Sequence, residues 1–516
     1  MASNGYALAS DREDDDRRFS IDSFELASDL EDSREFRRTG AGSSVGVSEP
    51  LIHESRLSQI EAPAVTLSEY NSRGDEPESG NDDWALELLP EREGKSKNGI
   101  KMAFMNMANS IIGAGIIGQP YAMMECGMIT GILLLIVLTF VIDWTIRLMV
   151  VNAKLSGTNS YQATVSACFG RPGYLVISLA QGLFAFGGSV AFTVIIGDTI
   201  PFVISAVFPW FASTPGLSLL TERTPVIVFV ILFISFPLSL SRNIAHLAKA
   251  SLLALVSMLI IIISVCVEGR KVARDEQGSF SSSLLTINSG VFQGIGVISF
   301  AFVCHHNSLL IYGALRKPTL DRFAKVTHWS TGVSCLACLT LALAGFITFR
   351  DKTQGNVLNN FPQDNLFINI ARFCFGFNML TTFPLEIFVC REVLLDYIYS
   401  TFVTSTTSSA TSTDSTVSTS PSLLVHRFTT AGLTILTLLC SLAVGGNLGF
   451  VLELVGSTSA CVLAYILPPL CYLRLANSLE SRSFRHRLGP IACVAFGVIV
   501  MIVSTVLTIV SRIKKS

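Results

Sequence analysis

The chain has 516 residues, of which 50% are hydrophobic and 15% are charged, and its mean hydropathy is +0.53. Soluble globular domains carry about 25% charged residues, so this composition excludes an ordinary soluble protein. The net charge of −2 combines two unlike parts: of 39 acidic and 37 basic side chains, 23 and 11 lie in residues 1–100, which leaves 16 and 26 for the remaining 416 residues.

The N-terminal part, residues 1–96, is acidic and has little from which to build a core. Residues Asp11 to Arg18 are all charged, and the stretch from Glu69 to Asp83 is rich in Ser, Glu and Gly. Segments of this composition bury too little apolar surface to offset the entropy of the chain. We therefore predict a disordered cytoplasmic tail without a secretory signal, available to regulatory partners.

The rest of the chain alternates apolar runs with polar loops. A helix needs about 20 apolar residues to cross the hydrocarbon core of a membrane. Continuous rather than alternating apolar runs predict helices instead of strands, and the fourth run is short and contains Pro237. We identify eleven runs, at residues 101–122, 127–148, 174–199, 225–241, 247–267, 290–312, 329–349, 366–389, 427–446, 448–472 and 489–511.

The basic residues of the loops indicate the orientation. Lys and Arg gather in cytoplasmic loops, and the loops on the side of the N-terminus carry 14 of them against 6 on the other side. This predicts a cytoplasmic N-terminus, although eleven spans then place the basic C-terminal end on the far side. Between spans 8 and 9, the run from Ser400 to Ser422 is almost entirely Ser and Thr, which predicts a flexible cytoplasmic loop at residues 400–424.

Span 1 departs from a plain membrane helix. It contains NSIIGAGIIGQPYA from Asn109 to Ala122, with three glycines and a proline. One interpretation is that the small residues let neighbouring helices pack closely. The other is that the helix breaks around Gly113, Ala114 and Gly115, with its freed backbone groups facing a cavity.

Span 6 favours the second interpretation, because it is interrupted in a similar way. Glycines at 290, 294 and 296 precede ISFAFVCHHNSLLIYGAL, from Ile298 to Leu315. Two glycine-interrupted spans that lie five apart predict an inverted 5+5 repeat, with repeats at about 97–268 and 288–472 and an extra helix at 489–511. In such folds the ends of half-helices bind a substrate carboxylate and a cation. The expected fold is an all-α polytopic secondary transporter of a small zwitterion or anion.

Polar side chains inside the spans are further candidates, since they are costly at that depth. Asn109 precedes the first break, His305 and His306 follow the second, and span 8 carries Thr381, Thr382 and Glu386. Each has a structural alternative: a threonine in a helix often donates to the carbonyl four residues earlier.

Three titratable residues are candidates for a proton relay: His305, His306 and Glu386. A histidine changes its charge near neutral pH, but adjacent histidines on a helix point to different faces, so at most one lines a pathway. Glu386 has the alternative of pairing with Arg391, and Asp143 and Arg147 form a similar i, i+4 pair.

Signatures of an ATP-driven pump are incomplete. Gly94-Lys95-Ser96 lacks the first glycine of a phosphate-binding loop, and Asp351-Lys352-Thr353, which is similar to the phosphorylation site of P-type pumps, lies in a short loop.

Cys335 and Cys338 have no second pair for a zinc site, while Cys126 and Cys266 are candidates for a disulfide at the outer ends. We expect no cofactor, no metal, no nucleic-acid partner and no enzymatic activity, and ion coupling as the source of energy.

Four segments resemble the amino acid/auxin permease family. Asn109–Ala122 is similar to its span-1 signature. PLSLSRNIAHLAKAS (Pro237–Ser251), SFAFVCHHNSLLIYGAL (Ser299–Leu315) and LTTFPLEIFVCREVL (Leu380–Leu394) resemble its vacuolar amino-acid transporters and sodium-coupled neutral amino-acid transporters. The resemblance covers about residues 97–512 and implies an eleven-span LeuT-type fold that moves amino acids.

The resemblance also implies the site. The substrate-binding residues of span 1 would be Ser110, Ile111, Ile112, Gly113, Ala114 and Gly115, and those of span 6 would be Ser299, Phe300, Ala301 and Phe302. Asn109, Thr381 and Thr382 would hold the coupling ion, H+ or Na+. Gln119 stands where an apolar residue is usual, and Ala114 and Gly115 offer no hydroxyl, so backbone carbonyls are expected to bind the amino group.

The sequence thus predicts a secondary active transporter of neutral amino acids in a vacuolar or lysosome-like membrane, whose partners are its substrate and the lipid bilayer. A plasma-membrane sodium symporter and a non-transporting amino-acid sensor are the alternatives. Vacuolar relatives of fungal type tend to use protons and the animal branch often uses sodium, so the coupling ion stays open.

Overall fold

The computed structural model describes residues 99–240, 251–406, 423–476 and 485–515. The chain divides into two units, Met1–Glu87 and Leu88–Ser516. The predicted tail and most of the Ser/Thr-rich loop lie outside the described residues. All the helices below belong to the second unit.

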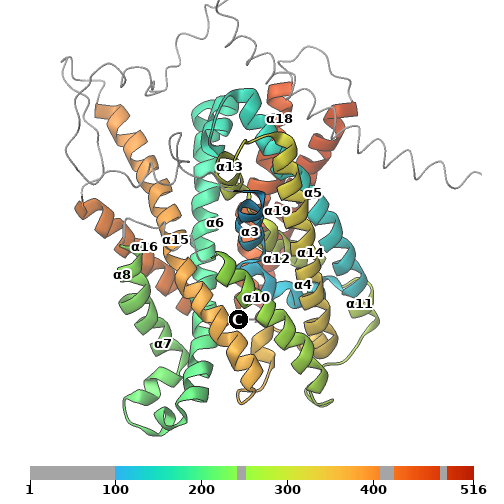
Figure 1. The fold of residues 1–516 in the computed structure, drawn as a ribbon, viewed down its shortest axis with the longest axis vertical. Helices are drawn as coiled ribbons and strands as arrows, with labels where there is room; N and C mark the ends of the chain where they lie inside the picture. Colours follow the sequence, from blue (N-terminus) through green and yellow to red (C-terminus); the bar gives the residue numbers. More distant parts are fainter. Residues whose placement is uncertain (1–98, 241–250, 407–422, 477–484, 516) are drawn as a thin grey trace, which may run out of the picture. The chain divides into compact units, whose positions relative to one another are not determined.

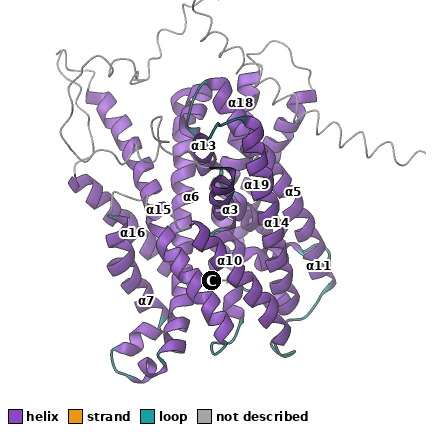
Figure 2. Cartoon of the chain, viewed as in Figure 1, coloured by secondary structure: helices purple, strands orange, loops and turns teal. Residues whose placement is uncertain are grey.

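The described residues form helices joined by short loops and contain no strand (Figure 1, Figure 2). Among them, ten helical segments are long and apolar enough to cross a membrane, and an eleventh, Arg223–Ser239, is shorter. This confirms the all-α polytopic fold predicted from the sequence. The short fourth span coincides with the run that contains Pro237.

The first five spans comprise α3 (Ile100–Ile112), η3 (Ala114–Gly118) and α4 (Gln119–Cys126); α5 (Met128–Ser156); α6 (Tyr161–Val207); α7 (Arg223–Val230), η6 (Ile231–Ser235) and α8 (Phe236–Ser239); and α10 (Ser251–Glu268). The other six comprise α12 (Val291–Phe302) and α13 (His305–Gly313); α14 (Leu320–Phe349); α15 (Leu366–Thr406); α16 (Leu423–Val444); α17 (Leu448–Val455), η11 (Gly456–Ala460), η12 (Val462–Ile466) and α18 (Leu467–Ala476); and α19 (Arg485–Lys515). The loop between α14 and α15 contains the short helix η9 (Val357–Asn360).

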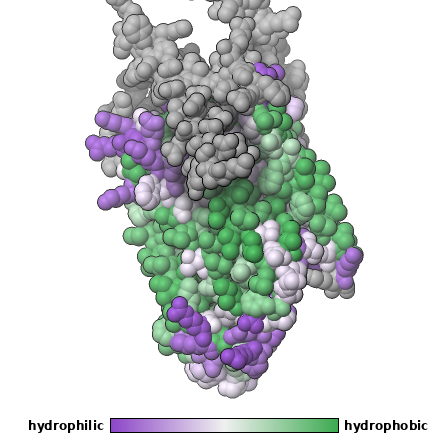
Figure 3. All heavy atoms as spheres, turned by 90° about the vertical axis from the view of Figure 1, so that its right-hand side faces the viewer, coloured by the Kyte–Doolittle hydropathy of each residue, from purple (hydrophilic) through white to green (hydrophobic). Residues whose placement is uncertain are grey.

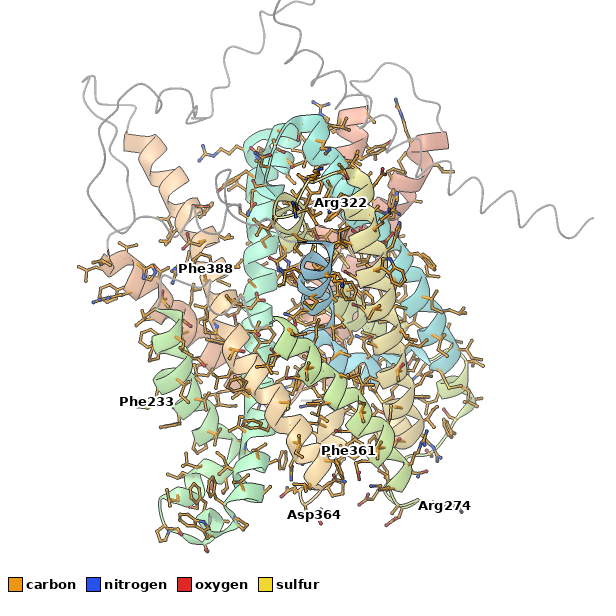
Figure 4. The ribbon with its side chains drawn as sticks, viewed as in Figure 1. Phe233, Arg274, Arg322, Phe361, Asp364 and Phe388 are labelled. Atoms are coloured by element: carbon orange, nitrogen blue, oxygen red, sulfur yellow. The ribbon has the colours of Figure 1, made fainter. Side chains whose placement is uncertain are left out.

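The outward surface of these helices is apolar. Phe140, Phe233 and Leu179 expose 71%, 68% and 64% of their surface. Figure 3 shows apolar residues over much of the visible face, with hydrophilic residues gathered at its lower end and at the upper left. In Figure 4, Arg322 lies near one end of the helices and Asp364 near the other. Contiguous apolar surface of this extent fits a lipid environment, so the chain is a multi-pass membrane protein.

The two glycine-interrupted spans lie in the middle of the helices, between α6 and α14 (Figure 1). Within this arrangement α4 packs against both α12 and α14, and α3 packs against α14 and α10. Around them, α6 and α15 pack along each other. Spans 1 and 6 are therefore neighbours although about 180 residues separate them in the sequence.

Several helices extend beyond the spans predicted from the apolar runs, α6 and α15 by the most residues. The helix α6 begins at Tyr161, where the Ser160 side chain accepts a hydrogen bond from the Ala163 N–H at 3.1 Å. Gly170 has a non-helical backbone with φ of 65° and separates this first part from the membrane span. Glycine readily adopts such a positive φ. The helix α15 continues to Thr406, beyond the predicted end at residue 389.

Candidate functional site

The first break lies directly after α3. The helix ends at Ile112, and the Gly113 N–H donates to the Asn109 carbonyl at 3.1 Å. The last four carbonyls of a helix have no intrahelical partner, which leaves those of Ser110 to Ile112 at the end of α3. The backbone then resumes as η3 from Ala114. The break predicted around Gly113, Ala114 and Gly115 is confirmed.

The second break lies at Val303 and Cys304, between α12 and α13. The Val303 N–H donates to the Ser299 carbonyl at 3.2 Å, and α13 begins at His305. The sequence segment Ser299–Phe302 therefore forms the last turn of α12 and carries its terminal carbonyls, while the first N–H groups of α13 follow directly. Each break places a negative helix C-terminus next to a positive helix N-terminus.

The two breaks meet. A Cβ atom added to Gly115 would lie 2.3 Å from Cα of Ala301, so the backbones of η3 and α12 are in contact. Across the breaks, the Asn307 amide donates to the Ser110 hydroxyl at 3.4 Å. The structure thus brings together the two segments that the sequence predicts to bind the substrate. Their role as ligands stays a prediction.

Two aromatic residues that the sequence analysis missed adjoin the breaks. The Tyr465 and Ser299 hydroxyls are hydrogen-bonded at 3.0 Å, and Tyr465 is completely buried. The Phe184 ring lies 5.5 Å, between ring centroids, from Phe300 and also from His306. Both residues lie within apolar runs of spans 10 and 3, where no local pattern distinguishes them from ordinary core residues.

The predicted ion ligands are not joined by a hydrogen bond among the described residues. The Thr381 and Thr382 hydroxyls both donate to the Asn378 carbonyl, at 2.9 and 2.7 Å, which is the structural alternative noted for threonine in a helix. Each hydroxyl oxygen keeps its lone pairs for a cation. The coupling-ion role of Asn109, Thr381 and Thr382 stays a prediction.

The two histidines face different neighbours, as expected for adjacent helical positions. His305 is completely buried and its Nε2 lies 3.0 Å from the Thr145 hydroxyl of α5, whereas His306 lies against Phe184 of α6. In the described part of the chain, Nδ1 of each ring is buried and has no hydrogen-bond partner. Only His305 is linked to another span by a hydrogen bond.

Glu386 does not form the pair with Arg391 that its spacing suggests. Its carboxyl group lies close to Gly188 of α6, and Arg391 instead contacts Glu392 at 3.3 Å and donates to the Ser239 carbonyl at 3.2 Å. The other predicted pair is confirmed, since Arg147 and Asp143 lie 3.0 Å apart. A proton-relay role of Glu386 and the histidines stays a prediction.

The twelve cysteines all lie within the described residues, and all are free. Cys126 and Cys266, the candidates for a disulfide, are therefore not paired. Cys126 instead lies against the α12 backbone, where its thiol contacts the Val291 carbonyl at 3.7 Å.

Comparisons with known proteins agree with this architecture. The profile of the family described as "Transmembrane amino acid transporter protein" matches residues 96–510. Vacuolar amino acid transporter 2 of Saccharomyces cerevisiae is 42% identical over 426 residues, which cover 82% of this chain and 86% of that protein. Putative sodium-coupled neutral amino acid transporter 11 is 37% identical in Danio rerio, over 79% of this chain and 86% of that protein, and 32% identical in Homo sapiens, over 75% and 89%. The chain therefore belongs to the transmembrane amino acid transporter family and is a transporter rather than an enzyme.

Proposed function

We propose that this protein is a secondary active transporter that moves neutral amino acids across a membrane by alternating access, coupled to protons or to sodium. The observation that carries the proposal is the contact of the two breaks at Gly115 and Ala301. Opposite helix ends side by side offer N–H groups to a carboxylate and carbonyls to an ammonium group. An amino acid has both groups next to each other.

The preference for neutral amino acids follows from the surroundings of the breaks. The rings of Phe184 and Phe300 and the buried Ser299–Tyr465 pair adjoin the end of α12. A charged side chain placed against such groups would lose its hydration without a compensating partner, which is costly. An uncharged side chain avoids that cost.

The vacuolar or lysosome-like membrane is the proposed location, with the N-terminus in the cytoplasm. The similarity to the Saccharomyces cerevisiae vacuolar transporter supports the membrane, and the excess of basic residues in the loops on the N-terminal side supports the orientation. The acidic tail, residues 1–96, would then face cytoplasmic regulatory partners.

Uptake by the purified protein in liposomes tests the function. Labelled neutral amino acids are supplied under an imposed pH gradient and, separately, under an imposed sodium gradient. We expect one gradient to drive accumulation, and its identity names the coupling ion. Binding of amino acids without accumulation under either gradient would contradict transport and support a sensor.

A substitution of Thr382 in span 8 tests whether this residue binds sodium. If sodium drives uptake, Thr382→Ala removes one hydroxyl ligand and should raise the half-saturating sodium concentration roughly tenfold, equivalent to about 1.4 kcal/mol. Thr340→Ala is the matched control, because the Thr340 hydroxyl also donates to the carbonyl four residues earlier, at 2.7 Å, but on the exposed surface of α14. An unchanged sodium dependence in Thr382→Ala would remove this residue from the ion site.

A further inference from the structure

Glu453 is a buried carboxylate inside span 10 that the sequence analysis did not consider. It lies in α17 and exposes 4% of its surface. The Tyr121 hydroxyl donates to its Oε1 at 2.7 Å, and the Thr508 hydroxyl donates to its Oε2 at 3.1 Å. Tyr121 belongs to α4 and Thr508 to α19, so this carboxylate joins three spans. An acidic group inside a membrane span is a functional candidate by default.

The backbone of Glu453 also contacts the other broken span. A Cβ added to Gly296 of α12 would lie 2.9 Å from the Glu453 carbonyl oxygen. Gly296 lies one turn before Ser299, and Tyr121 lies in the half-helix that follows the first break. Glu453 therefore contacts both broken spans, and it lies three residues before the start of η11, a π-helical stretch of a kind frequent at functional sites.

The ionisable groups near Glu453 have other neighbours. On α4, Glu125 lies next to Tyr121, and its carboxylate is close to Gly290 at the N-terminus of α12, an end that favours negative charge. On α19, the Arg512 guanidinium lies 5.6 Å from the Phe450 ring and donates to the Val444 carbonyl at 3.4 Å. The facing residues of α12 and η3 contain no ionisable side chain. Other ionisable side chains on elements packed against span 10 include Cys126 of α4, Asp198 of α6, which pairs with Arg223, Asp143 of α5, which pairs with Arg147, His305 and His306 of α13, and Cys440 of α16. Span 10 itself also carries Cys461 and Tyr465.

The two hydroxyl partners suit both protonation states of a carboxyl group. A hydroxyl donates to a carboxylate and, after rotation, accepts from a carboxylic acid. The hydrogen bond from Tyr121 is charge-assisted while Glu453 is ionised, and such bonds are roughly twice as strong as neutral ones. Protonation would therefore weaken the attachment of α4 to α17 without leaving a buried polar group unpaired.

We propose that Glu453 binds the coupling proton of this transporter. This inference rests on the proposed transport function and identifies the coupling ion as H+. The proton binds to a carboxylate oxygen on the side where the amino acid enters. Weakening of the Tyr121–Glu453 bond then frees the half-helix α4 to move relative to span 10 (α4, α12 and α19 are labelled in Figure 1). The proton dissociates on the opposite side, and the ionised carboxylate takes up Tyr121 again.

The experiment compares accumulation with exchange. Full-length protein in liposomes receives labelled neutral L-amino acids, either under a pH gradient or, without a gradient, against the same unlabelled amino acids inside. One pH unit is worth about 1.4 kcal/mol per proton, which permits about tenfold accumulation. Glu453→Gln keeps the size and the hydrogen bonds of the side chain but binds no proton. We expect it to lose accumulation, to keep exchange, and to show exchange that no longer changes with pH.

Glu125→Gln is the matched control, since it neutralises the other carboxylate beside Tyr121, and it should keep pH-driven accumulation. If wild-type protein accumulates amino acids only under a sodium gradient, proton coupling fails for the whole protein. If wild-type and Glu453→Gln proteins respond equally to the pH gradient, only the role of Glu453 fails.

If Glu453→Gln loses both accumulation and exchange, Glu453→Asp distinguishes proton binding from a structural role, because it restores a titratable group with a shorter side chain. Recovery of pH-driven accumulation in Glu453→Asp supports the proposal. Loss of both activities in Glu453→Asp, with an unchanged unfolding temperature, assigns Glu453 a purely structural role and overturns it.

Discussion

Gly113 and Gly115 lie two residues apart in the first break, but their surroundings differ. An added Cβ at Gly113 would meet the Asn109 carbonyl oxygen at 3.6 Å, which is ordinary contact, whereas at Gly115 it would lie 2.3 Å from Cα of Ala301. The neighbour at Gly115 is backbone and has no flexible end that could move away. The contact between the two breaks therefore depends on Gly115.

We expect Gly115→Ala to abolish most of the uptake into liposomes. Extra atoms in a closely packed contact cost about 1–3 kcal/mol, and here the cost falls on the contact between the two substrate-binding segments. Gly332→Ala on α14 is the control, because a Cβ there meets nothing within 4 Å. Wild-type uptake by Gly115→Ala would show that the two breaks separate without loss of function.

Phe184 is expected to limit the size of the transported side chain. Phe184→Ala removes the ring that lies against Phe300 and His306, and should raise uptake of phenylalanine relative to alanine about tenfold, within the range that such pocket changes give. Phe192→Ala, at an equally buried position of the same helix, should leave the ratio unchanged. The test measures competition between the two labelled amino acids, and an equal ratio in both variants would show that Phe184 does not limit the transported side chain.

At the scale of elements, Arg372 fixes the loop between α14 and α15. This fully buried arginine of α15 donates to the carbonyls of Leu358 and Phe361 at 2.8 and 2.9 Å and to the Asn369 side chain at 2.7 Å. Its guanidinium also lies 4.6 Å from the Phe202 ring of α6. The loop helix η9 that it holds contacts η3 of the first break. One side chain thus couples span 8 to the segment next to the candidate site.

Arg372→Leu should destabilise the protein, because it leaves several buried carbonyls without a donor, at a cost of about 1–3 kcal/mol for each unpaired group. Thermal unfolding of the detergent-purified protein measures the effect, and we expect a lower midpoint together with reduced uptake. Arg270→Leu, at an exposed position, should leave the midpoint close to that of wild type. A wild-type midpoint for Arg372→Leu would mean that other contacts hold the loop.

The elements were predictable from the sequence to the extent that local residues decide them. Apolar runs identify the spans, and the glycines of span 1 locate the first break, because helix interruption there is a local property of those residues. The glycines of span 6, at 290, 294 and 296, lie at the start of α12 and within it, seven or more residues before the second break at Val303 and Cys304, so they do not mark its position. Which side chains meet is decided by packing between distant spans. Phe184 and Tyr465 therefore carried no local signal, whereas Glu453 did carry one, since it is an acidic residue inside the apolar run of span 10. The spacing of Glu386 and Arg391 suggested a pair that the packing of α15 does not form.

At the scale of the whole molecule, the described helices belong to one unit, Leu88–Ser516, and the family profile covers residues 96–510. We therefore expect the transport machinery to lie outside the acidic tail. Deletion of residues 1–95 should leave uptake by the purified protein within about twofold of wild type, a change of roughly 0.4 kcal/mol in the barrier. Complete loss of uptake would show that the tail takes part in the transport cycle, and deletion of residues 1–50 would then locate the necessary part.

The length of α15 has a consequence for the surface of the protein. A helix of 41 residues is about 60 Å long, roughly twice the thickness of the hydrocarbon core. With its apolar part, up to Ile398, extending through the bilayer, the last turns of the helix continue beyond that part to Thr406. The serine- and threonine-rich segment therefore begins within this helical extension, at Ser400, where a soluble modifying enzyme would meet its first residues in helical form.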